Sequence, residues 1–99
     1  MTQKQASQVK KLRSSRGFPD ITLYEPRDRY SALFIELKRT GEKVFRKDGS
    51  IYTNTHLQEQ HDMILKLRER GYYADFAIGF DKAKKLVDWY LNLEKRKDE

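Results

Sequence analysis

The sequence has no cysteine, only two prolines and no apolar run long enough to cross a bilayer. Without cysteine, disulfides and thiolate metal sites are excluded, and only His56 and His61 remain as nitrogen ligands. Oxygen atoms are therefore the expected ligands for any metal. No secretory signal pattern stands at the N-terminus, so we expect a soluble protein in the cytoplasm.

Acidic residues are also scarce, and none precedes Asp20. The chain has 21 Lys and Arg residues against 15 Asp and Glu residues, which gives a formal net charge of +6. Such a balance favours an anionic partner, either nucleic acid or an acidic membrane surface, and the lack of a spanning segment favours nucleic acid. The 99 residues suffice for one domain over residues 1–99, with a frayed charged tail at 94–99.

The apolar pattern predicts alternating strands and helices. A basic helix is expected over Gln3 to Ser14, where Lys10, Lys11 and Arg13 accompany weakly repeating apolar residues. Residues 41–54 are polar and read as an outward excursion with a turn at Asp48-Gly49, where a second small hairpin is an option.

The second half of the chain predicts helix, strand and helix. Thr55 opens a capping-box pattern, and apolar spacing then carries a helix to Gly71, a suitable C-terminal cap. A strand follows at residues 72–78. Asp81 is expected to cap a last helix whose buried stripe comprises Ala83, Leu86, Val87, Tyr90 and Leu91.

Residues 21–24 and 32–38 are β-rich runs that predict a hairpin, joined by a polar loop containing Pro26. A turn centred near Asp28 places Asp20 opposite Glu36, with Cα atoms roughly 4.5–5.5 Å apart. Because side chains alternate, one face then carries Asp20, Thr22, Tyr24, Phe34, Glu36 and Lys38. The other face is aliphatic and is predicted to pack against helices; it comprises Ile21, Leu23, Leu33, Ile35 and Leu37.

Two carboxylates and an ammonium on one face suit phosphodiester hydrolysis. A hard cation such as Mg²⁺ prefers carboxylate oxygens, and Asp20 and Glu36 supply them. Lys38 lies about 6.6 Å beyond Glu36 along the strand, where it can orient water or stabilise charge on the phosphate. Neighbouring carboxylates oppose a general-base role for Lys38, whereas a bound cation favours one; orienting water and stabilising charge is the preferred interpretation.

Taken together, Gly17-Phe18-Pro19-Asp20, then Ile35-Glu36-Leu37-Lys38, then a helix with Gln60, Leu67 and Gly71 resembles a known pattern. It is similar to the virus-type replication-repair nuclease (VRR-NUC) domain of the PD-(D/E)XK superfamily. The resemblance covers residues from about Gln5 to Leu93.

The resemblance implies an α/β fold with an αβββαβ-type core, in which a small mixed sheet is flanked by helices. It implies Mg²⁺ or Mn²⁺ at Asp20, Glu36 and the Leu37 carbonyl, and a catalytic Lys38. Gln60 is expected to help to place water or phosphate, against the alternative of a tolerated polar residue at the margin of the helix stripe. The resemblance also implies a stand-alone phage or prophage protein that acts on branched DNA as a homodimer, like resolvases of four-way (Holliday) junctions. The family usually has a further acid on its first helix, and this chain has none before Asp20.

Simpler interpretations stay open for several residues. Asp20 could be an ordinary residue at the start of a strand after proline, and Glu36 and Lys38 could form the solvated face of an edge strand. The histidines are expected on solvated helix surface, and Tyr72, Tyr73, Trp89 and Tyr90 in a core or dimer interface. A phosphate-tracking role is expected, against a merely soluble surface, for Lys10, Lys11, Arg13, Arg16, Arg39, Lys43, Arg46 and Lys47.

Three functions compete. A metal-dependent, structure-selective DNA endonuclease is favoured. A non-catalytic nucleic-acid-binding module that keeps the fold is motivated by the missing upstream acid. A basic structural protein accounts for the charge but not for the convergence of Asp20, Glu36 and Lys38 on one face.

Overall fold

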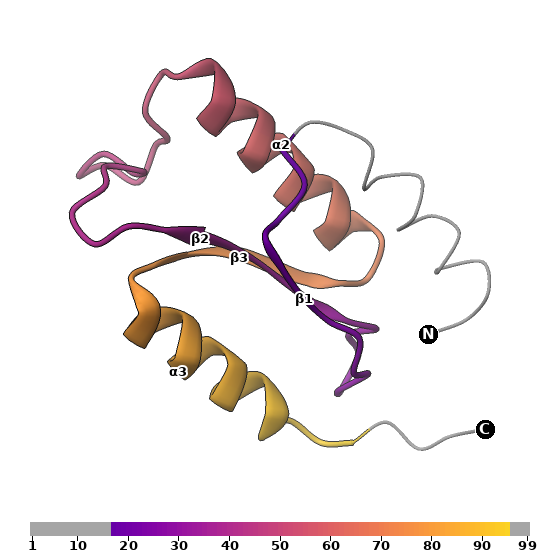
Figure 1. The fold of residues 1–99 in the computed structure, drawn as a ribbon. Coiled ribbons are helices and arrows are strands. Elements are labelled where there is room, and N and C mark those ends of the chain that lie inside the picture. The colour runs from indigo at the N-terminus through magenta and orange to yellow at the C-terminus, as the bar shows by residue number, and fades with distance from the viewer. Residues whose placement is uncertain (1–16, 96–99) are drawn as a thin grey trace.

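A three-stranded sheet with one helix on each face forms the centre of the computed structural model, which describes residues 17–95 (Figure 1). In chain order the elements are β1 (Ile21–Leu23), β2 (Leu33–Lys38), α2 (Thr55–Glu69), β3 (Tyr73–Ile78) and α3 (Phe80–Leu91). β1 runs antiparallel to β2, and β2 runs parallel to β3. The predicted small mixed α/β sheet is confirmed.

The predicted N-terminal helix and four of the proposed DNA-binding cations lie outside the described residues; these are Lys10, Lys11, Arg13 and Arg16. Within residues 17–95, no helix is both long and apolar enough to cross a membrane.

The predicted hairpin register is confirmed. Ile21 pairs with Ile35, and Leu23 pairs with Leu33. The same register, continued by one residue, sets Asp20 opposite Glu36. The intervening loop closes where Arg27 and Tyr30 exchange two backbone hydrogen bonds of 3.0 and 2.8 Å, and Asp28 takes a positive φ of 49° there.

Helices cover both faces of the sheet. The aliphatic face packs against α3, as predicted, with Leu33 and Ile35 fully buried in that cluster. The opposite face is covered by α2, because Phe34 and Ala74 bury their side chains against Leu57, Ile64 and Leu67 of that helix and its surroundings. One residue of the aliphatic face departs from the prediction: Leu37 stays 40% exposed, beyond the reach of α3 packing.

The ends of α2 follow ordinary capping chemistry. Asn54, not the predicted Thr55, is the N-cap, because its side-chain oxygen accepts the Leu57 N–H at 3.1 Å. At the other end Gly71 has φ 87°, and the Gly71 and Tyr72 N–H groups donate back to Arg68 and Leu67 carbonyls at 3.1 Å. This left-handed cap confirms the predicted stop at Gly71.

The last helix begins earlier than predicted. α3 starts at Phe80 directly after Gly79, so Asp81 lies inside the first turn, and its predicted capping role is wrong. Leu91 was also placed wrongly in the buried stripe, since it is 39% exposed, and Leu93 packs against the α3 cluster instead.

The segment between β2 and α2 is anchored at one residue. Val44 is 1% exposed and belongs to the cluster under α2. Beyond it, a single antiparallel bridge joins Phe45 to Ile51 around the predicted turn, where Gly49 has φ 89° and Asp48 accepts hydrogen bonds from Ser50. The turn is confirmed, and the hairpin is reduced to this one bridge.

The chain after α3 is tied to the β1–β2 loop. The Asp28 N–H donates to the Glu94 carbonyl at 2.7 Å, and Lys95 forms a bridge with Arg27. The prediction of a frayed tail is therefore wrong for Glu94 and Lys95, while residues 96–99 lie outside the described part.

Candidate metal and phosphate site

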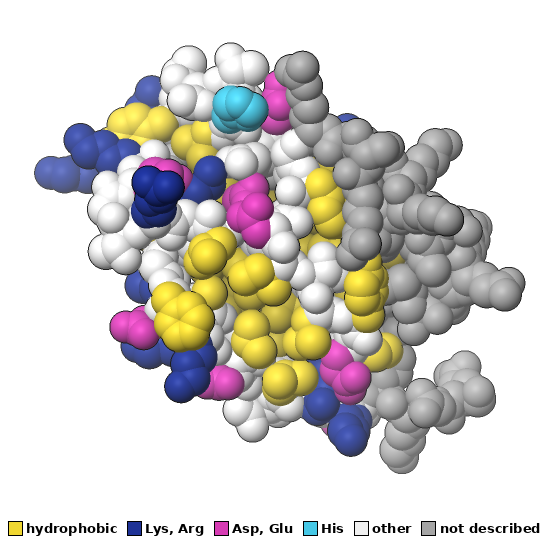
Figure 2. Space-filling model, viewed as in Figure 1, with side chains coloured by type: hydrophobic (Ala, Val, Ile, Leu, Met, Phe, Trp, Pro, Cys, Tyr) yellow, Lys and Arg dark blue, Asp and Glu magenta, His cyan; other side chains and the backbone are white. Residues whose placement is uncertain are grey.

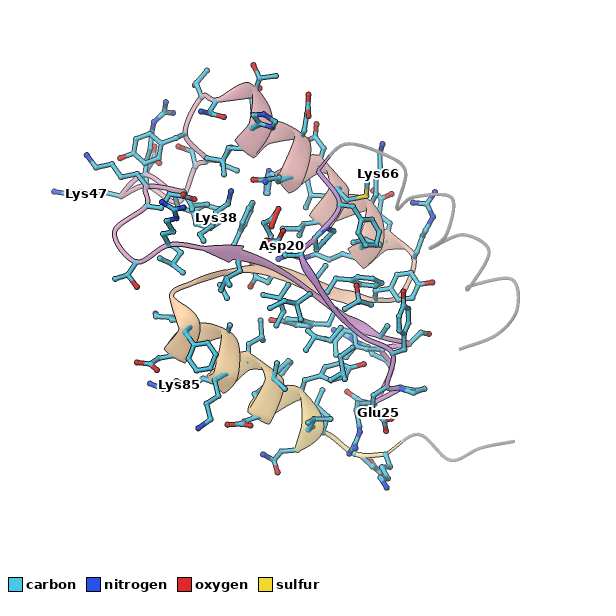
Figure 3. All side chains as sticks on the ribbon, in the orientation of Figure 1. Asp20, Glu25, Lys38, Lys47, Lys66 and Lys85 are labelled. Atoms are coloured by element: carbon cyan, nitrogen blue, oxygen red, sulfur yellow. The ribbon has the colours of Figure 1, made fainter. Side chains whose placement is uncertain are left out.

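Asp20 stands at the bend that leads into β1, immediately after the buried Pro19. Its Oδ2 atom accepts the Leu37 N–H at 3.1 Å. This bond ties the start of β1 to the far end of β2 and holds the Asp20 carboxylate beside Glu36. Figure 3 shows Asp20 and Lys38 near one another, between the sheet and α2.

Gly17 sets how closely this segment approaches α2. It has φ 81°, and a Cβ atom there would lie 2.6 Å from the Glu59 carbonyl oxygen and 2.9 Å from the Gln60 nitrogen. Real Cβ atoms do not come so close, so only glycine permits this contact. The segment that carries Asp20 is thereby seated on the backbone of α2 next to Gln60.

Glu36 is a buried acid, with 3% of its surface exposed. Burial, followed by the hydrogen bond and the negative charge of Asp20, raises the pKa of its carboxyl to about 8, while Lys38 opposes the shift. The shift favours the protonated form of Glu36. The two carboxyl groups thus combine a buried oxygen ligand at Glu36 with an exposed one at Asp20.

Lys38 is held by two partners from separate parts of the chain. Its ammonium donates to the side-chain oxygen of Gln60 at 2.6 Å and forms an ion pair with Glu42 at 3.5 Å. Sequence reasoning singled out Gln60 but missed Glu42. Glu42 returns to the site because its N–H donates to the Arg39 carbonyl at 2.9 Å, in a turn that includes Gly41 at φ 88°.

The Leu37 backbone faces the side of β2 that β1 leaves open. The Lys38 carbonyl accepts the Gly79 N–H at 2.8 Å, so Lys38 faces β3, and the alternate residue Leu37 faces the opposite way. Continuing the hairpin register brings Pro19 opposite Leu37. Because proline has no N–H, that position offers no ladder hydrogen bond to the Leu37 carbonyl.

Two surface cavities adjoin Lys38. One, of about 430 Å³, is lined by residues that include Lys38, Glu42, Lys43, Tyr52, Asn54 and His56. The other, of about 440 Å³, is lined by Asp20, Leu37, Lys38, Arg39, Thr40, Gly79 and Phe80. Arg39 and Lys43, both predicted to bind phosphate, therefore line different cavities that share Lys38.

The space-filling view places acidic and basic side chains close together above a hydrophobic patch on this face (Figure 2). Thr40 and Phe80 are cavity residues that sequence reasoning missed, because only the folded turns bring them to β2.

The structure also places the histidines and the aromatic residues that the sequence analysis considered. His56 is exposed, as predicted, whereas His61 is partly buried beside the rings of Phe45 and Phe76, with centroids 6.5 and 6.3 Å away. Tyr72 and Tyr90 are core residues with 1% and 0% exposure, and Trp89 is 43% exposed beside Tyr73.

The donor set suits a hard divalent cation. Two carboxyl groups lie in contact, and the one on Glu36 is buried with a raised pKa, so a cation placed there would offset the repulsion between the two carboxylates. Across residues 17–95 no group of three or more His, Asp or Glu side chains is arranged around a common metal position. Mg²⁺ tolerates few protein ligands because it keeps several waters.

Comparisons with known proteins find clear similarity among solved structures. No family model and no curated protein matches the chain. A solved structure described as a "VRR_NUC domain protein" superposes with a TM-score of 0.67 at 26% identity. The match covers 92% of this chain and 66% of that one, so the chain spans just under two thirds of its neighbour's length. The predicted fold class is confirmed.

Proposed function

We propose that this chain, whose fold is that of a VRR-NUC nuclease-family domain, is a metal-dependent DNA endonuclease that hydrolyses phosphodiester bonds. The observation that carries the proposal is the meeting of four side chains from three parts of the fold. Asp20 precedes β1, Glu36 and Lys38 lie on β2, and Gln60 comes from α2. Nothing in the packing of a purely structural domain requires this meeting.

Asp20, Glu36 and the Leu37 carbonyl would hold the metal. A bound Mg²⁺ or Mn²⁺ supplies charge neutralisation at the phosphate and makes water more acidic. The residues prepare the position: the Leu37 N–H orients the Asp20 carboxylate, burial limits solvent at Glu36, and Pro19 leaves the Leu37 carbonyl without a ladder donor. Glu36 would hold the cation in its carboxylate form.

Lys38 acts on the substrate side. An ammonium has three N–H donors, and Gln60 and Glu42 engage two of them. The third remains for the attacking water or a phosphate oxygen. A lysine held by two partners loses little freedom in the transition state, so its charge is aimed before the reaction begins.

The proposed substrate is branched DNA, bound by a homodimer. The net charge of +6 and the cations Arg39 and Lys43 beside the two cavities support binding to phosphates. No helix of the described part presents an obvious set of base-reading side chains, which supports recognition of DNA shape. Two copies would present two sites to two strands of a four-way junction.

A cleavage assay on a labelled four-way junction with Mg²⁺ tests the proposal. The wild type is expected to cut, and Asp20→Ala is expected to lose the cuts. Asp88→Ala, an exposed acid on α3, is the matched control and should cut normally. Activity that persists in Asp20→Ala contradicts the site. Salt-sensitive binding without cleavage in Mg²⁺ or Mn²⁺ would instead favour a non-catalytic binding module.

A further inference from the structure

Phe80 is the most exposed of the large hydrophobic side chains in the described part of the chain. It is 75% exposed, whereas the next, Tyr24, is 47% exposed. A single exposed apolar residue is ordinary on a protein surface. Phe80 differs from such a residue in two ways. It lines a cavity with Asp20 and Lys38, and the residue before it is hydrogen-bonded to β2.

The ring borders the proposed site. Phe80 lines the cavity of about 440 Å³ that Asp20 and Lys38 also line. Leu37, 40% exposed, adds a second apolar surface in the same cavity. A ligand whose phosphate reaches Asp20 and Lys38 would therefore meet an apolar surface next to the phosphate.

The backbone before Phe80 is hydrogen-bonded to β2, the strand that carries Glu36 and Lys38. The Gly79 N–H donates to the Lys38 carbonyl at 2.8 Å, and a Cβ on Gly79 would lie 2.8 Å from the Thr40 hydroxyl oxygen. Gly79 has φ 89°, a backbone conformation that glycine adopts without strain. Phe80 is then the first residue of α3, whose Ala83 is buried under the sheet. Its Cα position is thus set relative to Lys38.

Two cations, Lys38 and Arg39, line the same cavity as this apolar surface, together with the acidic Asp20. Three further exposed cations lie on α3, the helix that begins at Phe80: Lys82, Lys84 and Lys85. Figure 3 shows Lys85 on the helix that begins at Phe80. An apolar ring in a cavity lined by Lys38 and Arg39 suits a ligand that is both anionic and flat. A nucleotide has this combination.

We propose that Phe80 stacks on a nucleobase next to the phosphate that occupies the Asp20 and Lys38 site. The base is an unstacked one, as found at branch points and strand ends, because a base inside a duplex offers no free ring face. The inference rests on the proposed function for its ligand, and it assigns Phe80 to substrate binding and to the choice of DNA structure. Aromatic side chains stack on bases with little regard to sequence, which agrees with recognition of shape.

Fluorescence tests the stacking directly. Trp89 is the only tryptophan of the chain, so Phe80→Trp combined with Trp89→Phe moves the sole indole to the cavity. In metal-free buffer, titration with a single-stranded oligonucleotide is expected to quench the emission as binding saturates. Unquenched emission, while polarisation of a labelled oligonucleotide reports binding, overturns the proposal.

A double-mutant cycle that combines a Phe80 variant with an altered oligonucleotide tests whether the ring contacts a base. Phe80→Leu keeps an apolar side chain but removes the ring face, and is expected to weaken oligonucleotide binding roughly 10-fold. An oligonucleotide with one abasic position next to the bound phosphate should weaken wild-type binding similarly and Phe80→Leu binding hardly at all. Leu65→Ala, on an exposed α2 residue, is the control and should bind as the wild type does.

The outcomes separate the two proposals. Quenching without cleavage overturns the nuclease proposal and leaves the stacking contact standing. Cleavage without quenching, or additive losses in the cycle, overturns the stacking contact alone. If Phe80→Leu changes the sedimentation of the protein but not its binding to DNA, the ring contacts a second copy and the proposal is overturned.

Discussion

The side-chain oxygen of Gln60 lies 2.6 Å from the Lys38 ammonium nitrogen and joins α2 to the strand that carries the proposed chemistry. Because this contact aims Lys38, its loss should slow the chemical step without weakening metal binding. We expect Gln60→Ala to lower kcat about 10-fold, and Lys38→Met to lower it by about 10²-fold or more. The measurements are kcat and KM for junction cleavage, together with Mn²⁺ binding by calorimetry.

Gln60→Glu keeps an acceptor and should retain more activity than the alanine variant. Weakened Mn²⁺ binding in Gln60→Ala would show that Gln60 supports the metal site instead.

Glu36 should make the metal-free protein less stable as pH rises. Its pKa is about 8 in the fold against 4.5 as its ordinary value, so the folded state holds an extra proton between these values. Protonated Glu36 therefore supports folding fully below about pH 4.5, and this support is lost as pH rises to about 8. Urea unfolding of the wild type and Glu36→Gln across pH 5–8 measures the effect as the difference between the two.

The expected result is that the stability of the wild type falls relative to Glu36→Gln over that range. Mn²⁺ at pH 8 should restore wild-type stability and leave Glu36→Gln unchanged, since the metal binds the carboxylate form. A difference that stays constant with pH would contradict the burial of Glu36 beside Asp20.

Gly17→Ala should disturb both the fold and the site. The added Cβ would lie 2.6 Å from the Glu59 carbonyl oxygen, at a backbone conformation of φ 81° that alanine adopts at a cost. Relief requires the Pro19-Asp20 segment to move away from α2. We expect a loss of about 1–3 kcal/mol in unfolding free energy and weaker Mn²⁺ binding.

Gly49→Ala is the matched control, because Gly49 also has a positive φ, 89°, but its Cβ would meet nothing within 4 Å. It should cost some stability and leave Mn²⁺ binding intact. Equal Mn²⁺ affinity in Gly17→Ala and the wild type would mean that this contact does not position Asp20.

The hairpin and its register could be predicted because they follow from local alternation. A shift by one residue would turn Leu33 and Ile35 outward, so the pattern permits one pairing of Asp20 with Glu36. The left-handed cap at Gly71 could be predicted for a similar reason, since few residues other than glycine adopt φ 87°.

The misplaced caps reflect choices that tertiary structure makes. Asn54 and Thr55 are both good caps, and the direction in which the chain enters α2 decides between them. Asp81 is not the cap because Gly79 alone joins β3 to α3, so the helix begins before Asp81. Glu42 and Phe80 were out of reach for sequence reasoning: each arrives at Lys38 through a turn whose conformation depends on packing.

Arg39 and Lys43 should contribute to DNA binding through phosphate contacts. Each contact releases condensed counterions, so its removal should reduce the slope of log K against log salt by about 0.9 on duplex DNA. We expect Arg39→Gln and Lys43→Gln each to lower affinity and flatten this slope, whatever the sequence of the DNA.

Lys66→Gln is the control, because Lys66 is an exposed cation of α2 that lines neither cavity (Figure 3). Fluorescence polarisation over a range of salt concentrations gives the slopes. If all three variants change the slope equally, the cations act through net charge alone; if only Arg39→Gln and Lys43→Gln do, the phosphate path runs past Lys38 through both cavities.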